Sequence, residues 1–163
     1  SIGDARASWP DDVELHPAIE QEMAARTARA RDVVQQGAEV AGPVIGAADE
    51  VLVIRGRVRG SIDCQGGVIV AHGGWVQGSI KADFVQVAGR VERPSASAKV
   101  EVTGVLVVMA TGALSIDACA GAMHIAYGSG INGALEHRGV TRKEADPVEQ
   151  SRAGFDTDRP TSA

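Results

Sequence analysis

The sequence is poor in aromatic residues, cysteine and positive charge. Aromatic side chains make up 3% of the 163 residues, which suits a narrow interior lined by Val, Ile, Leu and Ala. The net charge of −5 excludes the basic field that a nucleic-acid-binding surface needs. No apolar run approaches the ~20 residues of a membrane-spanning helix. Together these absences indicate a protein that binds no nucleic acid and has no transmembrane segment.

The two cysteines, Cys64 and Cys119, are too few for a disulfide framework. Their scarcity favours a reducing compartment, so we expect a cytoplasmic protein. Cys64 occupies the repeat position that Ala82 occupies in the next copy, and we interpret it as a small buried core residue.

The chain contains several imperfect copies of one short sequence motif. Val68–Ile80 returns as Met123–Leu135, a weaker copy runs over 106–118, and fragments of the same phrase cover 52–62 and 85–91. When the copies are aligned, apolar residues occupy the same positions in each copy, and so do glycines. A repeat at this scale predicts a stack of similar supersecondary units.

Within each copy, apolar residues alternate with polar or small ones, which is typical of strands. The copies start near residues 52, 68, 85, 106 and 123, at spacings of 16, 17, 21 and 17. A unit this short cannot hold a strand–helix–strand crossover, which takes about 30 residues. It fits one turn of a three-sided β-helix.

Pro94 interrupts the repeat, because proline cannot donate to a strand ladder, and it predicts a loop or bulge at this point. After it, either Val100–Val102 or Leu106–Val108 can serve as the first strand of the next turn. The sequence therefore predicts five to six turns within a β-helix domain over residues 44–137.

Residues 1–43 form a leader in which Ile19, Met23 and Val34 share one face at helical spacing, so we expect an amphipathic helix over 17–36. That helix either folds back on the β-helix or docks on a partner through these three residues. Residues 138–163 are polar and lack periodicity, and we expect a disordered C-terminal tail.

The chain contains no recognisable catalytic constellation. His72 and His124 occupy different repeat positions, so stacked metal ligands are not expected. The glycine-rich pieces are not phosphate loops, because none precedes a helix with Lys-Ser or Lys-Thr. We therefore predict no enzyme activity, no metal and no cofactor. A β-helix enzyme of the gamma-carbonic-anhydrase or transferase type is the minor alternative.

Several phrases together resemble a known family. They are Val44–Ala47 (VIGA), Leu52–Ile62 (LVIRGRVRGSI), Trp75–Ala82 (WVQGSIKA) and Val85–Glu92 (VQVAGRVE). The tandem pattern over 44–135 is similar to that of the bactofilins.

The resemblance to bactofilins implies a right-handed, three-sided β-helix that is not enzymatic. It implies end-to-end polymerisation into bacterial cytoskeletal filaments without a nucleotide. It also implies a scaffold for client proteins, such as cell-wall enzymes, with a cytoplasmic location that can include the inner membrane face.

A β-helix leaves unpaired backbone groups and an uncovered core at each end, which a second molecule can satisfy. The residues that we expect at the N-terminal end contact are Leu52, Ile54, Val58 and Ile62. Those expected at the C-terminal end contact are Met123, Ile125, Ile131 and Leu135. Trp75 and Tyr127 are candidate partner contacts, since they stand out on a chain with few aromatic residues. The alternative function is a non-polymerising adaptor of a larger complex that docks through the 17–36 helix.

Overall fold

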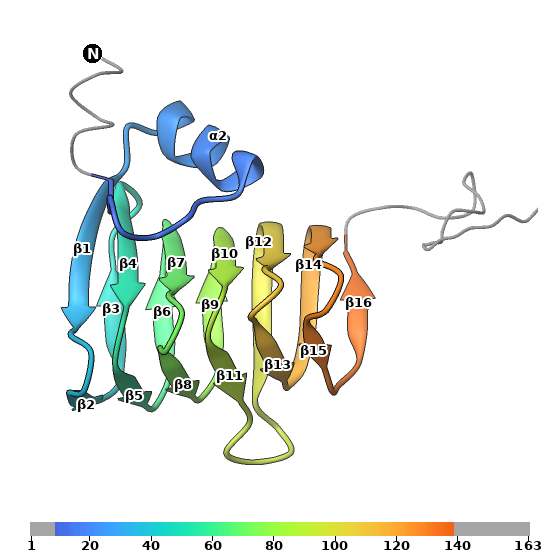
Figure 1. The fold of residues 1–163 in the computed structure, drawn as a ribbon. Helices are drawn as coiled ribbons and strands as arrows, with labels where there is room; N and C mark the ends of the chain where they lie inside the picture. Colours follow the sequence, from blue (N-terminus) through green and yellow to red (C-terminus); the bar gives the residue numbers. More distant parts are fainter. Residues whose placement is uncertain (1–8, 139–163) are drawn as a thin grey trace, which may run out of the picture.

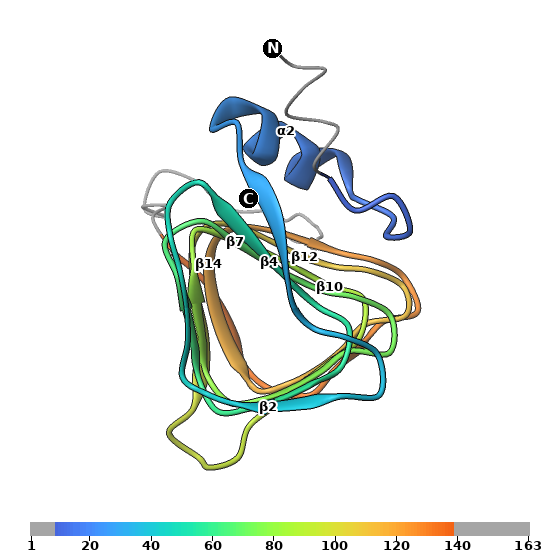
Figure 2. The ribbon, with the colours of Figure 1, turned by 90° about the vertical axis from the view of Figure 1, so that its left-hand side faces the viewer.

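A computed structural model describes residues 9–138, which form a parallel β-solenoid of six turns with one short helix along its side (Figure 1). Viewed along its axis, the solenoid has a triangular outline, so each turn supplies one short strand to each of three faces (Figure 2). The all-β, three-sided solenoid predicted from the repeat is confirmed.

Three stacks of parallel strands make up the faces. The first face contains β1 (Arg29–Val34), β4 (Glu50–Ile54), β7 (Gly67–Val70), β10 (Phe84–Val87) and the second halves of β12 (Lys99–Val108) and β14 (Asp117–Ile125). The second face contains β2 (Glu39–Ala41), β5 (Arg57–Arg59), β8 (Trp75–Gln77), β11 (Arg90–Glu92), β13 (Ala113–Ser115) and β15 (Gly130–Ile131). The third face contains β3 (Val44–Gly46), β6 (Ile62–Cys64), β9 (Ile80–Ala82), the first halves of β12 and β14, and β16 (Leu135–His137).

Strand register follows the repeat that is visible in the sequence. Leu52 pairs with Val68, Val68 with Val85, Val85 with Leu106, and Leu106 with Met123. The unit starts predicted from the sequence are therefore the equivalent residues of successive turns. Their side chains form one column of the apolar core.

The irregular stretch around Pro94 is a loop between β11 and β12, as predicted, and it accounts for the long spacing between Val85 and Leu106 (Figure 1). Both candidate strands after it are used. Val100–Val102 pairs with β9 on the third face, and Leu106–Val108 pairs with β10 on the first face of the next turn. β12 passes through a corner without ending, so its two halves belong to successive turns. The five predicted unit starts give five turns, and β1 to β3 add a sixth ahead of them.

The predicted helix over 17–36 is too long. The helix α2 spans Pro17–Ala25, Thr27 has a φ of +46°, and β1 begins at Arg29. Pairing of β1 with β4 overrides a weak helical stripe, because a strand edge offers a hydrogen-bond partner to every second residue. The solenoid therefore starts at Arg29, not at residue 44, and Val34 is a core residue with 3% exposure.

The helix lies along the outside of the first face (Figures 1 and 2). Its side chains pack against outward-facing residues of that sheet. Ile19 and Met23 are fully buried in a second apolar cluster with Ile69, Phe84 and Val107. Burial of each such side chain contributes about 1.5–3 kcal/mol. The first face is consequently apolar on both sides. Of the two alternatives for the helix, the structure shows the one in which it folds back on the β-helix.

No helix within residues 9–138 is long and apolar enough to cross a membrane. The predicted C-terminal tail lies outside the described residues except for Arg138.

Close backbone contact at the corners requires glycine. A Cβ added to Gly78 would lie 2.1 Å from the carbonyl oxygen of Gly60, one turn earlier. Any side chain at this position would force neighbouring turns apart.

We expect Gly78→Ala to lower the free energy of unfolding by more than about 1 kcal/mol, because the methyl group meets backbone that cannot move aside. Gly130→Ala is the matched control, since its added Cβ would have its nearest neighbour, the Ala113 Cβ, at 3.9 Å. Chemical denaturation of both variants measures the difference. Equal stabilities of the two would contradict the corner constraint.

Candidate functional site

The last turn of the solenoid is open. It consists of the second half of β14 with β15 and β16, and within residues 9–138 no strand pairs with its far edge. Ile125 and Leu135 are 40% and 39% exposed, whereas Val108 and Ala118, their equivalents one turn earlier, are 0% and 3% exposed. Met123 and Ile131 are partly buried and pack against the main core. All four predicted C-terminal end residues therefore belong to this open turn.

The predicted N-terminal end residues do not lie at an end. Leu52, Ile54, Val58 and Ile62 are at most 1% exposed, because they belong to the second turn and the first turn covers them. This prediction is wrong because residues 29–46 form a further turn of three strands, β1 to β3, instead of the continuation of a helix over 17–36. The core-facing residues of the actual first turn include Val34, Val40 and Val44.

A strap formed by residues 9–16 runs along the first face ahead of α2. Gln86, which is fully buried, donates through Nε2 to the Glu14 carbonyl at 2.8 Å, and its Oε1 accepts from the His16 amide at 2.8 Å. Burial of an amide side chain is costly unless both of its ends are hydrogen-bonded. Gln86 therefore anchors the strap to the middle of the sheet.

Ion pairs hold both ends of this N-terminal segment. Arg55 pairs with Asp12 of the strap and with Asp32 of β1, and Arg26 at the end of α2 pairs with Asp83. The Arg55 guanidinium holds the pKa of Asp12 below its ordinary value through a hydrogen bond. The segment is thus fastened to the solenoid by charge and by apolar packing.

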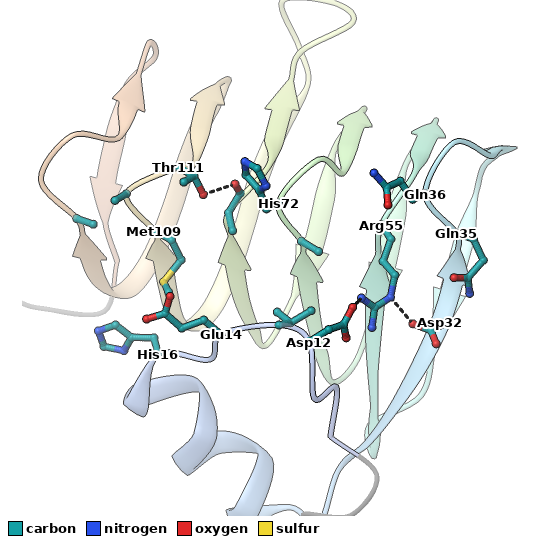
Figure 3. Close-up of a pocket in the computed structure, with 15 residues that line it drawn as sticks. Asp12, Glu14, His16, Asp32, Gln35, Gln36, Arg55, His72, Met109 and Thr111 are labelled. Carbon is teal, nitrogen blue, oxygen red and sulfur yellow. Dashed lines mark hydrogen bonds and ion pairs between the residues drawn. The ribbon is translucent and has the colours of Figure 1, made fainter.

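A groove of about 1040 Å³ lies between the strap and the corner at which the first-face strands end. Figure 3 shows Asp12 and Asp32 on either side of Arg55, with Glu14, His16 and His72 farther along the groove. Because Arg55 pairs with both aspartates, these carboxylates are not free to act as a general base. The hydroxyl of Thr111, which also lines the groove, donates to the Ala88 carbonyl at 2.7 Å.

His16 connects the strap to the last turn. Its ring lies 4.8 Å from that of His124, measured between ring centroids, and its Nδ1 accepts from the Ala18 amide at the start of α2. Burial, with a smaller contribution from His16, lowers the pKa of His124 below the ordinary histidine value of 6.5. The contact therefore favours a neutral His124.

The five predicted partner contacts have different fates. Ile19 and Met23 are buried between α2 and the first face, and Val34 of β1 is buried in the solenoid core. The prediction that a helix presents these three residues to a partner is therefore wrong. Trp75 is half-buried between the guanidinium groups of Arg57 and Arg90, whose Cζ atoms lie 4.1 and 4.2 Å from its ring centroid. Tyr127 is fully exposed at a corner of the last turn.

The cysteines are buried, as expected for Cys64, whose thiol pKa is raised by burial. In the part of the chain that the structure describes, no group of three or more His, Cys, Asp or Glu side chains is placed to hold a metal ion.

Sequence reasoning missed the covered first face, although the signal was present. Val51–Ile54, Phe84–Val87 and Val105–Val108 are nearly continuous apolar runs without alternation. Such runs are typical of strands that are buried on both sides. The single polar residue in these runs, Gln86, marks the anchor of the strap.

We expect Gln86→Leu to release the strap, because the Glu14 carbonyl and the His16 amide lose their partner at a cost of about 1–3 kcal/mol. Hydrogen exchange at residues 12–16 should become faster. Gln77→Leu is the matched control, since Gln77 lies on the second face and contacts Arg57 instead. Unchanged exchange in Gln86→Leu would exclude the anchoring role.

The lowered pKa of His124 predicts a pH dependence. The folded protein binds this proton less readily than the unfolded chain, so the free energy of unfolding should fall as the pH drops below 6.5. Denaturation curves between pH 8 and pH 5 measure this slope. His124→Gln should flatten it, and an identical slope in that variant would rule out His124 as its source.

The sequence comparison agrees with this architecture. Residues 32–136 match the family described as "Bactofilin: Polymer-forming cytoskeletal". No curated protein and no solved structure matches the chain. The match covers more than half of the 163 residues and coincides with the solenoid, so this chain belongs to the bactofilin family.

Proposed function

We propose that this protein is a bacterial cytoskeletal scaffold that assembles end to end through its solenoid and positions partner proteins. The observation that carries the proposal is the open last turn, where Ile125 and Leu135 are exposed on a core layer that another layer would normally cover. Membership of a polymer-forming family supports the same conclusion.

The interaction that joins two molecules is the one that joins turns within each molecule. Each internal junction combines parallel-strand hydrogen bonds with stacking of apolar side chains, as between Leu114 and Ile131 or Ala118 and Leu135. A second copy on the last turn would satisfy its free backbone groups and cover its apolar residues. This mode of assembly needs neither a nucleotide nor a cofactor, and we assign the protein no catalytic step.

Partner proteins require a surface that assembly leaves free. The outward surface of the second face offers Trp75 between Arg57 and Arg90, and the corner of the last turn offers Tyr127. Tryptophan, tyrosine and arginine are the residues most enriched at the centres of protein interfaces. We assign these residues to client binding, with clients at the cell wall or the membrane and a cytoplasmic location for the scaffold.

We expect Leu135→Glu or Ile131→Glu to block assembly, because stacking would bury an unpaired carboxylate at a cost of several kcal/mol. That cost corresponds to at least a 100-fold weaker association. Sedimentation velocity of the wild type and the variants, without nucleotide or metal, measures the loss.

Gln77→Glu is the matched control, since it adds the same charge to the outward surface beside Arg57. It should assemble like the wild type. The assembly contact is elsewhere if Leu135→Glu and Ile131→Glu sediment as the wild type does.

A further inference from the structure

One column of residues at the corner between the second and third faces departs from its glycine pattern at Arg93. By strand register the column contains, from the first turn to the last, Gly42, Gly60, Gly78, Arg93, Ile116 and Gly133. Glycine is required where adjacent turns touch, since a Cβ added to Gly60 would lie 2.9 Å from backbone atoms of Gly42. Arg93 fits in this column because the chain leaves the solenoid there, in the loop between β11 and β12 (Figure 1).

The Arg93 side chain reaches the last turn, two turns farther along the axis. Its guanidinium NH2 group donates to the Asn132 carbonyl at 3.3 Å and lies 3.8 Å from a carboxylate oxygen of Asp117. A Cβ added to Gly133 would lie 3.2 Å from the same nitrogen, so glycine leaves room for the guanidinium at this corner. The Arg93 amide donates to the Ser115 carbonyl of the turn in between. Arg93 thus links three successive turns.

Asp117 fastens the same corner from the intervening turn. The carboxylate oxygen that faces Arg93 also accepts from the Ala134 amide at 2.9 Å. One guanidinium and one carboxylate therefore hold the two peptide groups that flank Gly133, through the Asn132 carbonyl and the Ala134 amide. A hydrogen bond to a charged group is stronger than one between neutral groups.

This corner separates two residues of the stacking contact. Ile131 precedes it in β15, and Leu135 follows it in β16. β15 has only two residues, and all three residues of β16 are exposed. In a stack of turns, the last one has a neighbour on one side only, and such ends open more readily than the middle. Without a restraint, the corner would have to become ordered whenever a second copy stacks, which would weaken association.

We propose that Arg93 and Asp117 hold the last turn in the conformation that stacks, so that both are positioning residues for assembly. The inference rests on the proposed function, because it takes stacking on Ile131 and Leu135 as given. It applies to either orientation of the second copy, since the restraint lies within one molecule. It also gives a role to the loop at Pro94: by leaving the solenoid at a glycine position, the chain can place there a side chain long enough to span two turns.

The test compares Arg93→Gln with the wild type, both as the full chain. Sedimentation velocity over a range of concentrations measures assembly, and hydrogen exchange below the assembly concentration measures opening of residues 131–135. We expect faster exchange at these residues and about a tenfold higher concentration for assembly, which corresponds to the loss of one charge-assisted hydrogen bond of about 1.4 kcal/mol. Arg93→Lys keeps a charged donor and should behave like the wild type in both measurements.

Arg90→Gln is the matched control. It removes the same charge three residues earlier, where the guanidinium stacks on Trp75 and pairs with Glu92. Both exchange at 131–135 and assembly should remain as in the wild type. Asp117→Asn separates the two restraints, because asparagine can still accept from the Ala134 amide but does not attract the guanidinium. Its effect should lie between those of Arg93→Gln and the wild type.

The inference is overturned, with the proposed function left intact, if Arg93→Gln assembles like the wild type. Weaker assembly without faster exchange would also overturn it, since that result indicates a direct contact of Arg93 with the second copy. A wild type that is monomeric at every concentration would overturn the proposed function instead. Unchanged exchange in monomeric Arg93→Gln would then show that Arg93 does not hold the last turn either.

Discussion

The pairing of each strand with its equivalent one turn away is the interaction on which this molecule depends. It stacks Leu52, Val68, Val85, Leu106 and Met123 in one column and fixes every other column by the same register. Because each turn contacts only its neighbours, stability accumulates along the axis and each end leaves one layer half-finished. The open last turn is therefore a direct result of the architecture.

The N-terminal segment resolves a second problem of this architecture. The first face is apolar on its outer side as well as its inner side, and an exposed flat sheet of this kind invites aggregation. The strap and α2 cover it through Ile19, Met23 and the buried amide of Gln86. The strap and α2 thereby cover this face against lateral contacts.

The two ends are chemically unequal although the turns that form them are equivalent. The last turn exposes Ile125 and Leu135, whereas the first turn exposes Ile45 and carries an ion pair between Arg31 and Glu50. The family description, polymer-forming cytoskeletal, does not distinguish between the two ends.

Much of the fold could be predicted from the sequence because repeat and register are local. Alternation defined the strands, copy spacing defined the turns, and Pro94 marked the loop. The open C-terminal turn followed as well, since Ile131 and Leu135 lie in the last copy. The sequence alone thus determined the solenoid, the register of its strands and the residues of its last turn.

Only the tertiary structure decided the other end. Residues 29–34 have a helical stripe and a strand-forming Val33–Val34 pair, and the sequence does not say which prevails. The free edge of β4 decides in favour of the strand. Its backbone groups and the adjoining core stabilise residues 29–34 as a strand more than a weak helical propensity stabilises them as a helix. That choice moved Leu52, Ile54, Val58 and Ile62 into the interior. A second contact that no local pattern specifies places Gln86 under a strap 70 residues earlier in the chain.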